Sequence, residues 1–306
     1  MTIHRRQIIG RLRIWCRAFR LPFLGTSLLP FAAGSAFQVD HIAIVPLSLG
    51  LAVVGLTHIS ANLINDYADS RSGVDWKDST YYGLFGGSKL IQAGVLGEPL
   101  YLRAAVASAV AAVAGVASLT VLSGLWMTPV YFAAVLALAW AYSCPPFRLS
   151  YHRLGELTIL LLFGPALVMG GHYLQTGAFP ARDSFRFSLP FGLLTAGILI
   201  VNEVPDHDDD VSAGKFTLVT LVGKRRTGFL YGLTAGAALA MAVWNHQLPG
   251  LSKLTLSVVL AAVPAAGAAV ILARCPCQKS RLLNASRLAI VTQLVATLGL
   301  LAGVLW

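Results

Sequence analysis

The stretch HISANLINDYADSRSGVDWKD, residues 58–78, ends an apolar segment in a cluster of amides and carboxylates. An α-helix turns by about 100° per residue, so a helix through this stretch places four polar side chains on one face: Asn62, Asn65, Asp66 and Asp69. Amide and carboxylate oxygens are the ligands that Mg²⁺ prefers, and bound Mg²⁺ usually keeps places for water and substrate phosphate. The stretch therefore predicts a helix end that holds a divalent cation.

A second acidic cluster, NEVPDHDDDVSAGK, occupies residues 202–215. Its Asn202, Asp206 and Asp210 are spaced four apart, which again keeps them near one helix face. Asn65 and Asn202 are 137 residues apart, and so are Asp69 and Asp206. The matched offset predicts two equivalent helices whose ends face each other, with one diphosphate between two metal-bearing walls. The alternative is a solvated acidic loop, although five acids so close together near a bilayer need cations to offset their repulsion.

The composition is that of a membrane protein. Of the 306 residues, 56% are hydrophobic and only 12% are charged, and the mean hydropathy is +0.71. A helix needs about 20 apolar residues to cross a bilayer core. The sequence predicts nine such spans, near residues 21–37, 42–63, 101–122, 126–144, 155–174, 187–204, 228–244, 254–273 and 285–305.

The basic residues predict how these spans are oriented. With nine spans, all but three of the 23 Lys and Arg residues fall on the side that holds the N-terminus; the exceptions are Arg182, Arg186 and Lys253. By the positive-inside rule that side is cytoplasmic. Both acidic clusters and all four cysteines fall there too, where thiols stay reduced. The basic residues are scattered over loops, so the net charge of +10 indicates topology and attraction to anionic headgroups rather than nucleic-acid binding.

Residues 1–20 are basic with interleaved apolar side chains, which predicts a helix in the cytoplasmic headgroup layer. We expect no cleavable signal peptide, because the apolar run behind this segment is long enough to be the first span. Arg20 stands at the mouth of that span. It either binds the diphosphate or extends to a lipid phosphate.

Further candidates follow the two clusters. The loop after the first is polar and rich in glycine, and it can form a lid in which Gly86, Gly87 and Ser88 present backbone N–H groups to phosphate, with Lys89 as an adjacent charge. Lys215 follows the second cluster in a loop that can also fold over the site. We assign Arg20, Lys89, Lys215, Arg148 and Asn202 to the diphosphate.

A separate group of side chains is assigned to the acceptor: His58, Asn62 and Tyr142. His58 lies one turn before Asn62 inside the second span, where it either contacts substrate or is a buried histidine satisfied by a neighbour. Tyr142, Arg148 and Arg153 are candidates for lining the cytoplasmic mouth. For the two arginines the alternative is plain anchoring on the cytoplasmic side.

With these residues, the chain resembles the UbiA superfamily of intramembrane prenyltransferases over essentially its whole length. The resemblance rests on a first motif of the form NDxxD at residues 65–69, and on a DxxxD motif from Asp206 to Asp210. It implies a single domain over residues 1–306 with an all-α fold, in which nine transmembrane helices form a bundle with two pseudo-equivalent four-helix halves.

Within that superfamily, NDYADSRSGVD is similar to the branch of the 1,4-dihydroxy-2-naphthoate polyprenyltransferases of menaquinone synthesis. Asp75 follows a Ser-Gly pair as in that branch, and RLGELTILLLFGP, GGSKLIQAG and AGKFTLVTLVGK are similar too. The branch shows Asn-Asn-x-Arg-Asp before the second motif, whereas this chain has Asn202-Glu203-Val204-Pro205-Asp206. This departure leaves the acceptor open while the metal residues remain.

The resemblance implies an Mg²⁺-dependent transfer of a polyprenyl group from its diphosphate to an aromatic acceptor at the inner membrane. The implied metal ligands are Asn65, Asp66, Asp69, Asp206 and Asp210, and the implied catalytic carboxylates are the same four aspartates with Asp75. Asp66 or Asp75 takes a phenolic proton. The alternatives are another phenol such as 4-hydroxybenzoate, a terpene cyclase that needs no aromatic acceptor, or a transporter, whose carboxylates would lie nearer the bilayer midplane.

Overall fold

The structure, a computed structural model, describes residues 2–306, with side chains from residue 10 onward; the side chains of residues 1–9 of the predicted basic segment lie outside it. Its α-helices are α1 (Thr2–Ala18), α2 (Gly25–Ala36), α3 (Ile44–Ser72), α4 (Glu98–Ser123), α5 (Thr128–Ala141), α6 (Gly155–Leu161), α7 (Leu167–Thr176), α8 (Arg182–Glu203), α9 (His207–Ser212), α10 (Leu218–Val222), α11 (Thr227–Asn245), α12 (Ala262–Arg274) and α13 (Lys279–Leu305). The described residues form no strand, so the all-α prediction is confirmed.

Seven of the helical segments are long and apolar enough to cross a bilayer: Ile44–Ser72, Glu98–Ser123, Gly155–Thr176, Arg182–Glu203, Lys224–Asn245, Lys253–Arg274 and Lys279–Leu305. Two shorter apolar helices, Leu21–Ala36 and Thr128–Ala141, lie where the first and fourth spans were predicted. Apolar side chains also cover the outside of the bundle, for example Val121 at 83% and Val263 at 78% exposure. Such a surface suits lipid rather than water, and the protein is an integral membrane protein.

The fifth span is a broken helix. Between α6 and α7 the chain forms a π-helical turn, Leu162–Ala166, that contains Pro165. Proline has no backbone N–H and its ring clashes with the preceding turn, so an interior proline interrupts the α-helical ladder. Leu162, Phe163 and Ala166 from this turn line the central cavity described below. The interruption therefore shapes the wall of the site.

The two halves of the bundle repeat the same neighbour relations. The helix that ends in the first acidic cluster, α3, packs along α4, and the helix before the second cluster, α8, packs along α11. Small residues allow the closest approach between other spans: a side chain added at Gly164 would come within 3.0 Å of the Gly192 backbone nitrogen on α8. This close contact brings the broken span against the helix that carries the second cluster.

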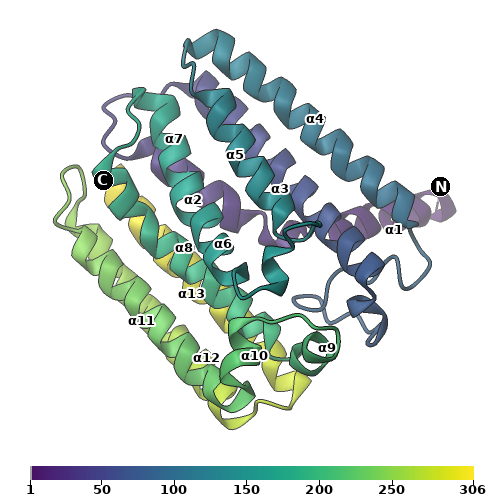
Figure 1. The fold of residues 1–306 in the computed structure, drawn as a ribbon. Helices are drawn as coiled ribbons and strands as arrows, with labels where there is room; N and C mark the ends of the chain where they lie inside the picture. Colours follow the sequence, from purple (N-terminus) through teal and green to yellow (C-terminus); the bar gives the residue numbers. More distant parts are fainter. Residues whose placement is uncertain (1) are drawn as a thin grey trace.

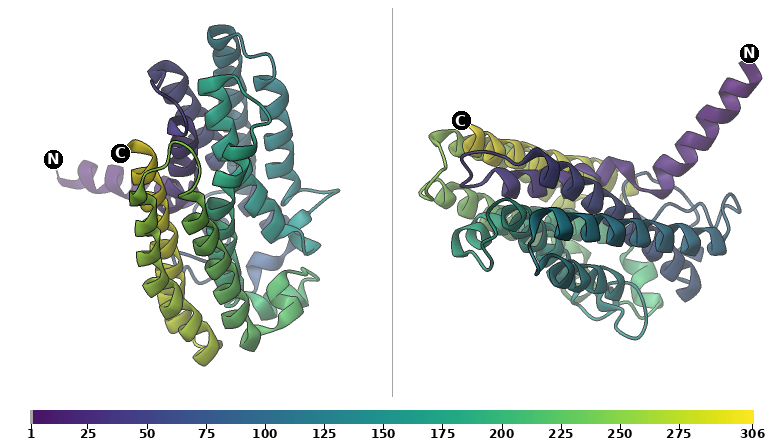
Figure 2. Two further views of the ribbon diagram at one scale, coloured as in Figure 1. Left: turned by 90° about the vertical axis from the view of Figure 1, so that its left-hand side faces the viewer. Right: turned by 90° about the horizontal axis from the view of Figure 1, so that it is seen from above.

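The connections that carry the acidic clusters gather at one end of the bundle. Figure 1 shows α9 and α10 at the lower end, beside the loop that follows α3. Helix α1 departs from the bundle at an angle, as the right-hand view of Figure 2 shows. Its C-terminal turn approaches the same loop, because the Arg17 guanidinium lies 3.5 Å from the Tyr81 ring centre and its Nε donates to the Ser88 carbonyl at 2.5 Å.

Candidate functional site

A cavity of about 560 Å³ runs into the bundle from the end that carries both clusters. Its polar end is lined by residues from both halves: Arg20, Asn65, Asp69, Asp75, Lys89, Asn202, Asp206, Asp209, Asp210 and Lys215. Its deeper part is lined by apolar side chains: Phe31, Val53, Val116, Leu119, Phe132, Val135 and Leu174. The structure thus brings two clusters that are 137 residues apart in the sequence to one cavity, and it joins them to an apolar channel.

The first wall of this cavity is the last turns of α3. Asp66 forms an ion pair with Arg20, whose Nη2 also donates to Asn65 Oδ1 at 3.0 Å. The Ser88 backbone N–H donates to the other Asp66 oxygen at 3.3 Å. Asp66 is 3% exposed and lies behind the cavity lining. Burial disfavours the charge on Arg20, but Asp66 beside it raises the Arg20 pKa above its usual value.

Asp69 on the same wall is held by neutral groups. Its Oδ2 accepts from Asn65 Nδ2 at 3.0 Å, and its Oδ1 accepts from the Tyr151 hydroxyl at 3.1 Å. The Asn65 amide also donates to Ser143 Oγ at 2.9 Å, which fixes its orientation. Asp69 is therefore positioned at the cavity surface without a Lys or Arg partner among the described side chains.

The loop after α3 folds back over the first wall. Gly73 adopts a left-handed conformation with φ 85° and ends the helix, which is where glycine is favoured. Asp75 then turns toward the cavity, where Lys89 Nζ donates to its Oδ1 at 2.9 Å and to its backbone carbonyl at 3.0 Å. Burial, followed by the nearby charge of Asp69, raises the Asp75 pKa to about 6, although Lys89 opposes this shift.

The second wall is formed by the end of α8 together with α9. Asp210 pairs with Lys215 at 3.3 Å, whereas Asp206 has no Lys or Arg partner among the described residues. Burial and the neighbouring Asp210 charge raise the Asp206 pKa to about 7. Burial also raises the pKa of Asp210; Lys215 opposes that shift, and the charge of Asp69 adds to it. The charge of one wall thus acts directly on the other.

Two glycines lie between the walls. A side chain added at Gly87 would come within 3.0 Å of Asp75 Oδ2 and 3.4 Å of Asp66 Oδ1, and one added at Gly86 within 3.7 Å of Asp206 Oδ1. Both residues have positive φ values, 74° and 75°, which glycine adopts readily. The predicted lid segment therefore lies between the two acidic clusters, and its positive φ values favour glycine at both positions.

The donor set fits a divalent cation that the chain shares with a substrate. Both Asp210 carboxylate oxygens and Asn202 Oδ1 are buried without a hydrogen-bond partner, and they face a cavity whose other ligands are carboxylates. In the part of the chain that the structure describes, no three His, Cys, Asp or Glu side chains are close enough to hold one ion together. One or two of these carboxylates would be enough for Mg²⁺, which usually completes its shell with water and substrate phosphate.

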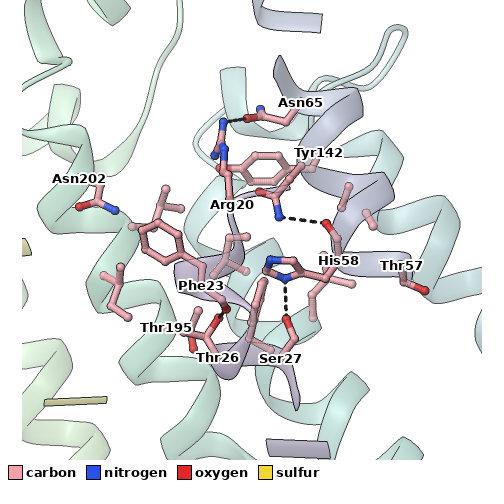
Figure 3. A pocket seen from close by; sticks show the side chains of 18 of the residues that line it. Arg20, Phe23, Thr26, Ser27, Thr57, His58, Asn65, Tyr142, Thr195 and Asn202 are labelled. Atoms are coloured by element: carbon pink, nitrogen blue, oxygen red, sulfur yellow. Dashed lines mark hydrogen bonds between the residues drawn. The ribbon is translucent and has the colours of Figure 1, made fainter. Parts of the chain in front are cut away.

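The residues assigned to the acceptor lie deeper in the same cavity. His58, Asn62 and Tyr142 all line it, and Figure 3 shows His58 between Ser27 and the backbone of its own helix. His58 Nδ1 is 2.8 Å from Ser27 Oγ, and the Asn62 amide donates to the His58 carbonyl at 2.9 Å rather than to its ring. His58 is therefore satisfied by a neighbour through one ring nitrogen, while its Nε2 has no partner.

Two predicted arginines lie away from the cavity lining. The Arg148 guanidinium lies 3.9 Å from the Tyr151 ring centre, and Arg153 lies 5.6 Å from the ring centre of Phe216. The Tyr151 hydroxyl, in turn, is the group that donates to Asp69. Arg148 thus supports the site through Tyr151, a residue that sequence reasoning missed because nothing in its spacing indicates a contact with α3.

The comparisons with known proteins agree with this geometry. The model of the UbiA prenyltransferase family matches residues 27–291. The chain is 31% identical over 229 residues to the 1,4-dihydroxy-2-naphthoate octaprenyltransferase of Mycobacterium tuberculosis, covering 74% of this chain and 75% of that protein. It is 26% identical over 254 residues to the 2-carboxy-1,4-naphthoquinone phytyltransferase of Synechocystis, covering 80% and 78%.

The fold also has a solved counterpart. A UbiA homolog from Archaeoglobus fulgidus bound to DMAPP and Mg²⁺ superimposes with a TM-score of 0.61 over 94% of this chain and 98% of that chain. The sequence identity is 14%, so this likeness concerns the arrangement of the helices.

Proposed function

Since this chain belongs to the UbiA prenyltransferase family, we propose that it transfers a polyprenyl group from polyprenyl diphosphate to 1,4-dihydroxy-2-naphthoate. The observation that carries the proposal is one cavity with two acidic walls at its mouth and an apolar channel behind them. A diphosphate and its hydrocarbon tail need these two environments side by side. The naphthoate acceptor is supported by the names of two relatives that share most of the chain's length.

The diphosphate binds at the mouth. Arg20, Lys89 and Lys215 lie around the polar end of the cavity, and each is paired there with one aspartate: Asp66, Asp75 and Asp210. A diphosphate is a stronger partner for these cations than a single carboxylate. Asn65, Asp69, Asp206 and Asp210 line the cavity and supply the oxygens that would hold Mg²⁺, whose positive charge stabilises the departing diphosphate when bound. Asp66, the remaining predicted ligand, bonds Arg20 and the Ser88 N–H instead.

The channel protects the reactive centre from water. Loss of diphosphate leaves an allylic cation at the head of the prenyl chain, which water would quench. Phe31, Val53, Leu119 and Phe132 surround the space where the chain lies, and the loop that carries Gly86 and Gly87 covers the mouth. An electron-rich carbon of the acceptor attacks the cation instead. With a naphthoate acceptor, the carboxyl group then leaves as CO₂.

The acceptor must lose a proton. Of the two carboxylates expected to take it, Asp75 lines the cavity, whereas Asp66 lies behind the lining and is paired with Arg20. The Asp75 pKa of about 6 is close to the working pH, which suits a general base. We therefore assign this role to Asp75.

An acceptor panel tests the proposal. Purified protein with Mg²⁺ and one labelled prenyl diphosphate is offered 1,4-dihydroxy-2-naphthoate, 4-hydroxybenzoate, other phenols or no acceptor, and product masses are read directly. We expect a mass that corresponds to prenylation with loss of CO₂ for the naphthoate. A prenylated 4-hydroxybenzoate would reassign the acceptor, and a hydrocarbon released without acceptor would indicate a cyclase.

We also propose that the mouth of the cavity faces the cytoplasm at the inner membrane. The proposal rests on the distribution of Lys and Arg described above. Cys277 is exposed in the connection before α13, which lies on the same side as the acidic clusters. A membrane-impermeant maleimide should label a Cys277-only variant in inverted vesicles and leave it unlabelled in intact cells; the reverse pattern would overturn the orientation.

A further inference from the structure

Two buried glutamates form a carboxyl pair beside the acidic motifs. Glu156, on the first turn of α6, is 4% exposed, and Glu203, the last residue of α8, is 5% exposed. Glu156 lies close enough to Glu203 for its charge to act on that carboxyl group. Glu203 lines the cavity, whereas Glu156 lies behind it. Neither residue belongs to the metal and diphosphate groups assigned above.

One member of the pair is firmly anchored. Glu156 Oε1 accepts from the Leu218 backbone N–H at 2.6 Å, at the start of α10. Two carboxyl groups close together inside a protein repel each other when both are ionised, so a hydrogen-bond donor beside them is favourable. Oε2 of each residue is buried without a hydrogen-bond partner. The pair therefore keeps hydrogen-bonding capacity that the protein leaves unused.

The groups around Glu203 determine which substrate group can form a hydrogen bond with it. Asn202, next to it on α8, has a buried Oδ1 without a partner, and Tyr142 lines the same cavity. Apolar Ile198 and Leu199 precede them on the cavity wall. Lys215 also faces Glu203, but its ammonium is paired with Asp210. A diphosphate gains nothing from two carboxyl groups, whereas an aromatic hydroxyl can form a hydrogen bond with a carboxyl group whether that group is ionised or not.

We propose that Glu203, together with Tyr142, binds a ring hydroxyl of the aromatic acceptor, and that Glu156 positions Glu203. This inference rests on the proposed aromatic prenyltransferase function. Glu203 is also a position where the chain departs from the Asn-Asn-x-Arg-Asp pattern, so the contact is a feature of this chain. Binding by an unpaired buried carboxyl discriminates strongly against an analogue that lacks the hydroxyl, because the group would stay unsatisfied.

The test compares Glu203→Leu and Glu203→Gln with the wild-type protein in steady-state kinetics for both substrates. We expect Glu203→Leu to raise the KM for the acceptor by about tenfold to a hundredfold while the KM for the prenyl diphosphate stays within about twofold. Glu203→Gln keeps a donor and an acceptor at this place and should recover part of the loss. An unchanged acceptor KM, or a rise confined to the diphosphate, overturns the assignment.

The preference between two matched acceptors is a second measurement, and partial misfolding of a variant does not change this ratio. The wild-type protein should prefer the dihydroxy acceptor over the analogue lacking one hydroxyl, and Glu203→Leu should lose most of that preference. Glu156→Gln should weaken it partly, since Glu156 acts through Glu203. Glu98→Gln is the control, because Glu98 bonds Ser70 Oγ at 2.7 Å outside the cavity, and it should leave the preference unchanged.

Equilibrium binding separates this inference from the proposed function. Acceptor binding is measured by the quenching of intrinsic fluorescence, in the absence of the prenyl donor and therefore without turnover. If the wild type binds and prenylates an aromatic acceptor and Glu203→Leu binds it equally well, this inference fails and the function stands. If the wild type neither binds nor prenylates any aromatic acceptor, the proposed function fails and this inference fails with it.

Discussion

The two walls of the cavity carry similar acidic motifs but satisfy them differently. On the α3 wall, Asp66 bonds Arg20 and the Ser88 N–H, and Asp69 bonds Asn65 and Tyr151. On the α8–α9 wall, Asp210 pairs with Lys215 at 3.3 Å, but neither of its oxygens nor Asn202 Oδ1 has a hydrogen bond, and Asp206 has a pKa raised to about 7. Hydrogen bonds within the protein hold one wall, whereas the other keeps buried oxygens that a bound cation would satisfy.

This difference indicates a division of labour within a pseudo-symmetric fold. Hydrogen bonds from the protein already hold Asp66 and Asp69 in place, which makes the α3 wall the preformed half of the site. Buried oxygens without partners are costly, and the α8–α9 wall gains most when a cation and diphosphate arrive. Equivalent helices thus supply a fixed wall and a wall completed by its ligands.

The largest effect should come from removing one carboxylate from either wall. Asp69→Ala and Asp206→Ala should each lower turnover by at least about a hundredfold, because both would lose charge that binds the metal and the leaving diphosphate. Product formation from labelled donor measures the loss, and detergent-phase gel filtration verifies folding. Asp40→Ala, on an exposed aspartate in the connection after α2, is the control. Full activity in either cavity variant would refute the metal assignment.

The second largest effect should be on thermal stability, which a substitution on one wall should lower and a substitution on the other should not. Asp66→Asn leaves the partly buried Arg20 charge without its partner, which should cost about 3 to 5 kcal/mol and lower the thermal midpoint in detergent. Asp206→Asn removes a carboxylate that has no cation partner and should not lower it. Equal destabilisation by both variants would contradict the contrast between the walls.

The pH dependence of stability, measured in EDTA so that no metal is bound, tests the second wall. The Asp206 pKa rises on folding from 3.8 to about 7, so its contribution to stability is present below pH 3.8 and is lost as the pH rises through 7. In EDTA we expect this loss to reach about 2 kcal/mol, since water entering the open cavity reduces the full effect. Asp206→Asn should flatten the profile between pH 4 and 8, as followed by thermal midpoints. An unchanged profile would show that the carboxylate is solvated.

The smallest effect should come from the ion pair that joins the loop after α3 to α13 in the second half of the bundle. Lys279 Nζ at the start of α13 donates to Asp78 Oδ2 at 2.5 Å and lies 5.0 Å from the Tyr82 ring centre. Both partners are partly exposed, so Lys279→Ala should cost about 1 kcal/mol or less. Hydrogen exchange in residues 74–89 should nevertheless increase, because the loop loses its anchor to the second half. Lys253→Ala at the other end of the bundle should leave that exchange unchanged.

Much of this architecture was predictable because it depends on local chemistry. Apolar length predicts membrane spans whatever lies beside them, and the four-residue spacing predicts that Asn202, Asp206 and Asp210 share a face. The two shorter apolar helices, α2 and α5, also lie within predicted spans, and they begin and end a few residues inside the predicted limits. The offset of 137 residues was the long-range signal, and it indicated correctly which two helices meet at the cavity.

The sequence could not predict which side chains of the site contact one another. Asp66 and Asp69 belong to one motif, yet only Asp69 lines the cavity. Asp66 lies behind the lining, where it pairs with Arg20. Arg148 stacks on Tyr151 instead of entering the mouth, and Glu156 meets Glu203 although 47 positions separate them in the chain. By itself the sequence determined the family and the membrane-spanning helices, and it predicted which residues hold a cation. Only the tertiary structure decided which charges pair and which oxygens stay free, because side-chain contacts between distant helices depend on how the helices pack.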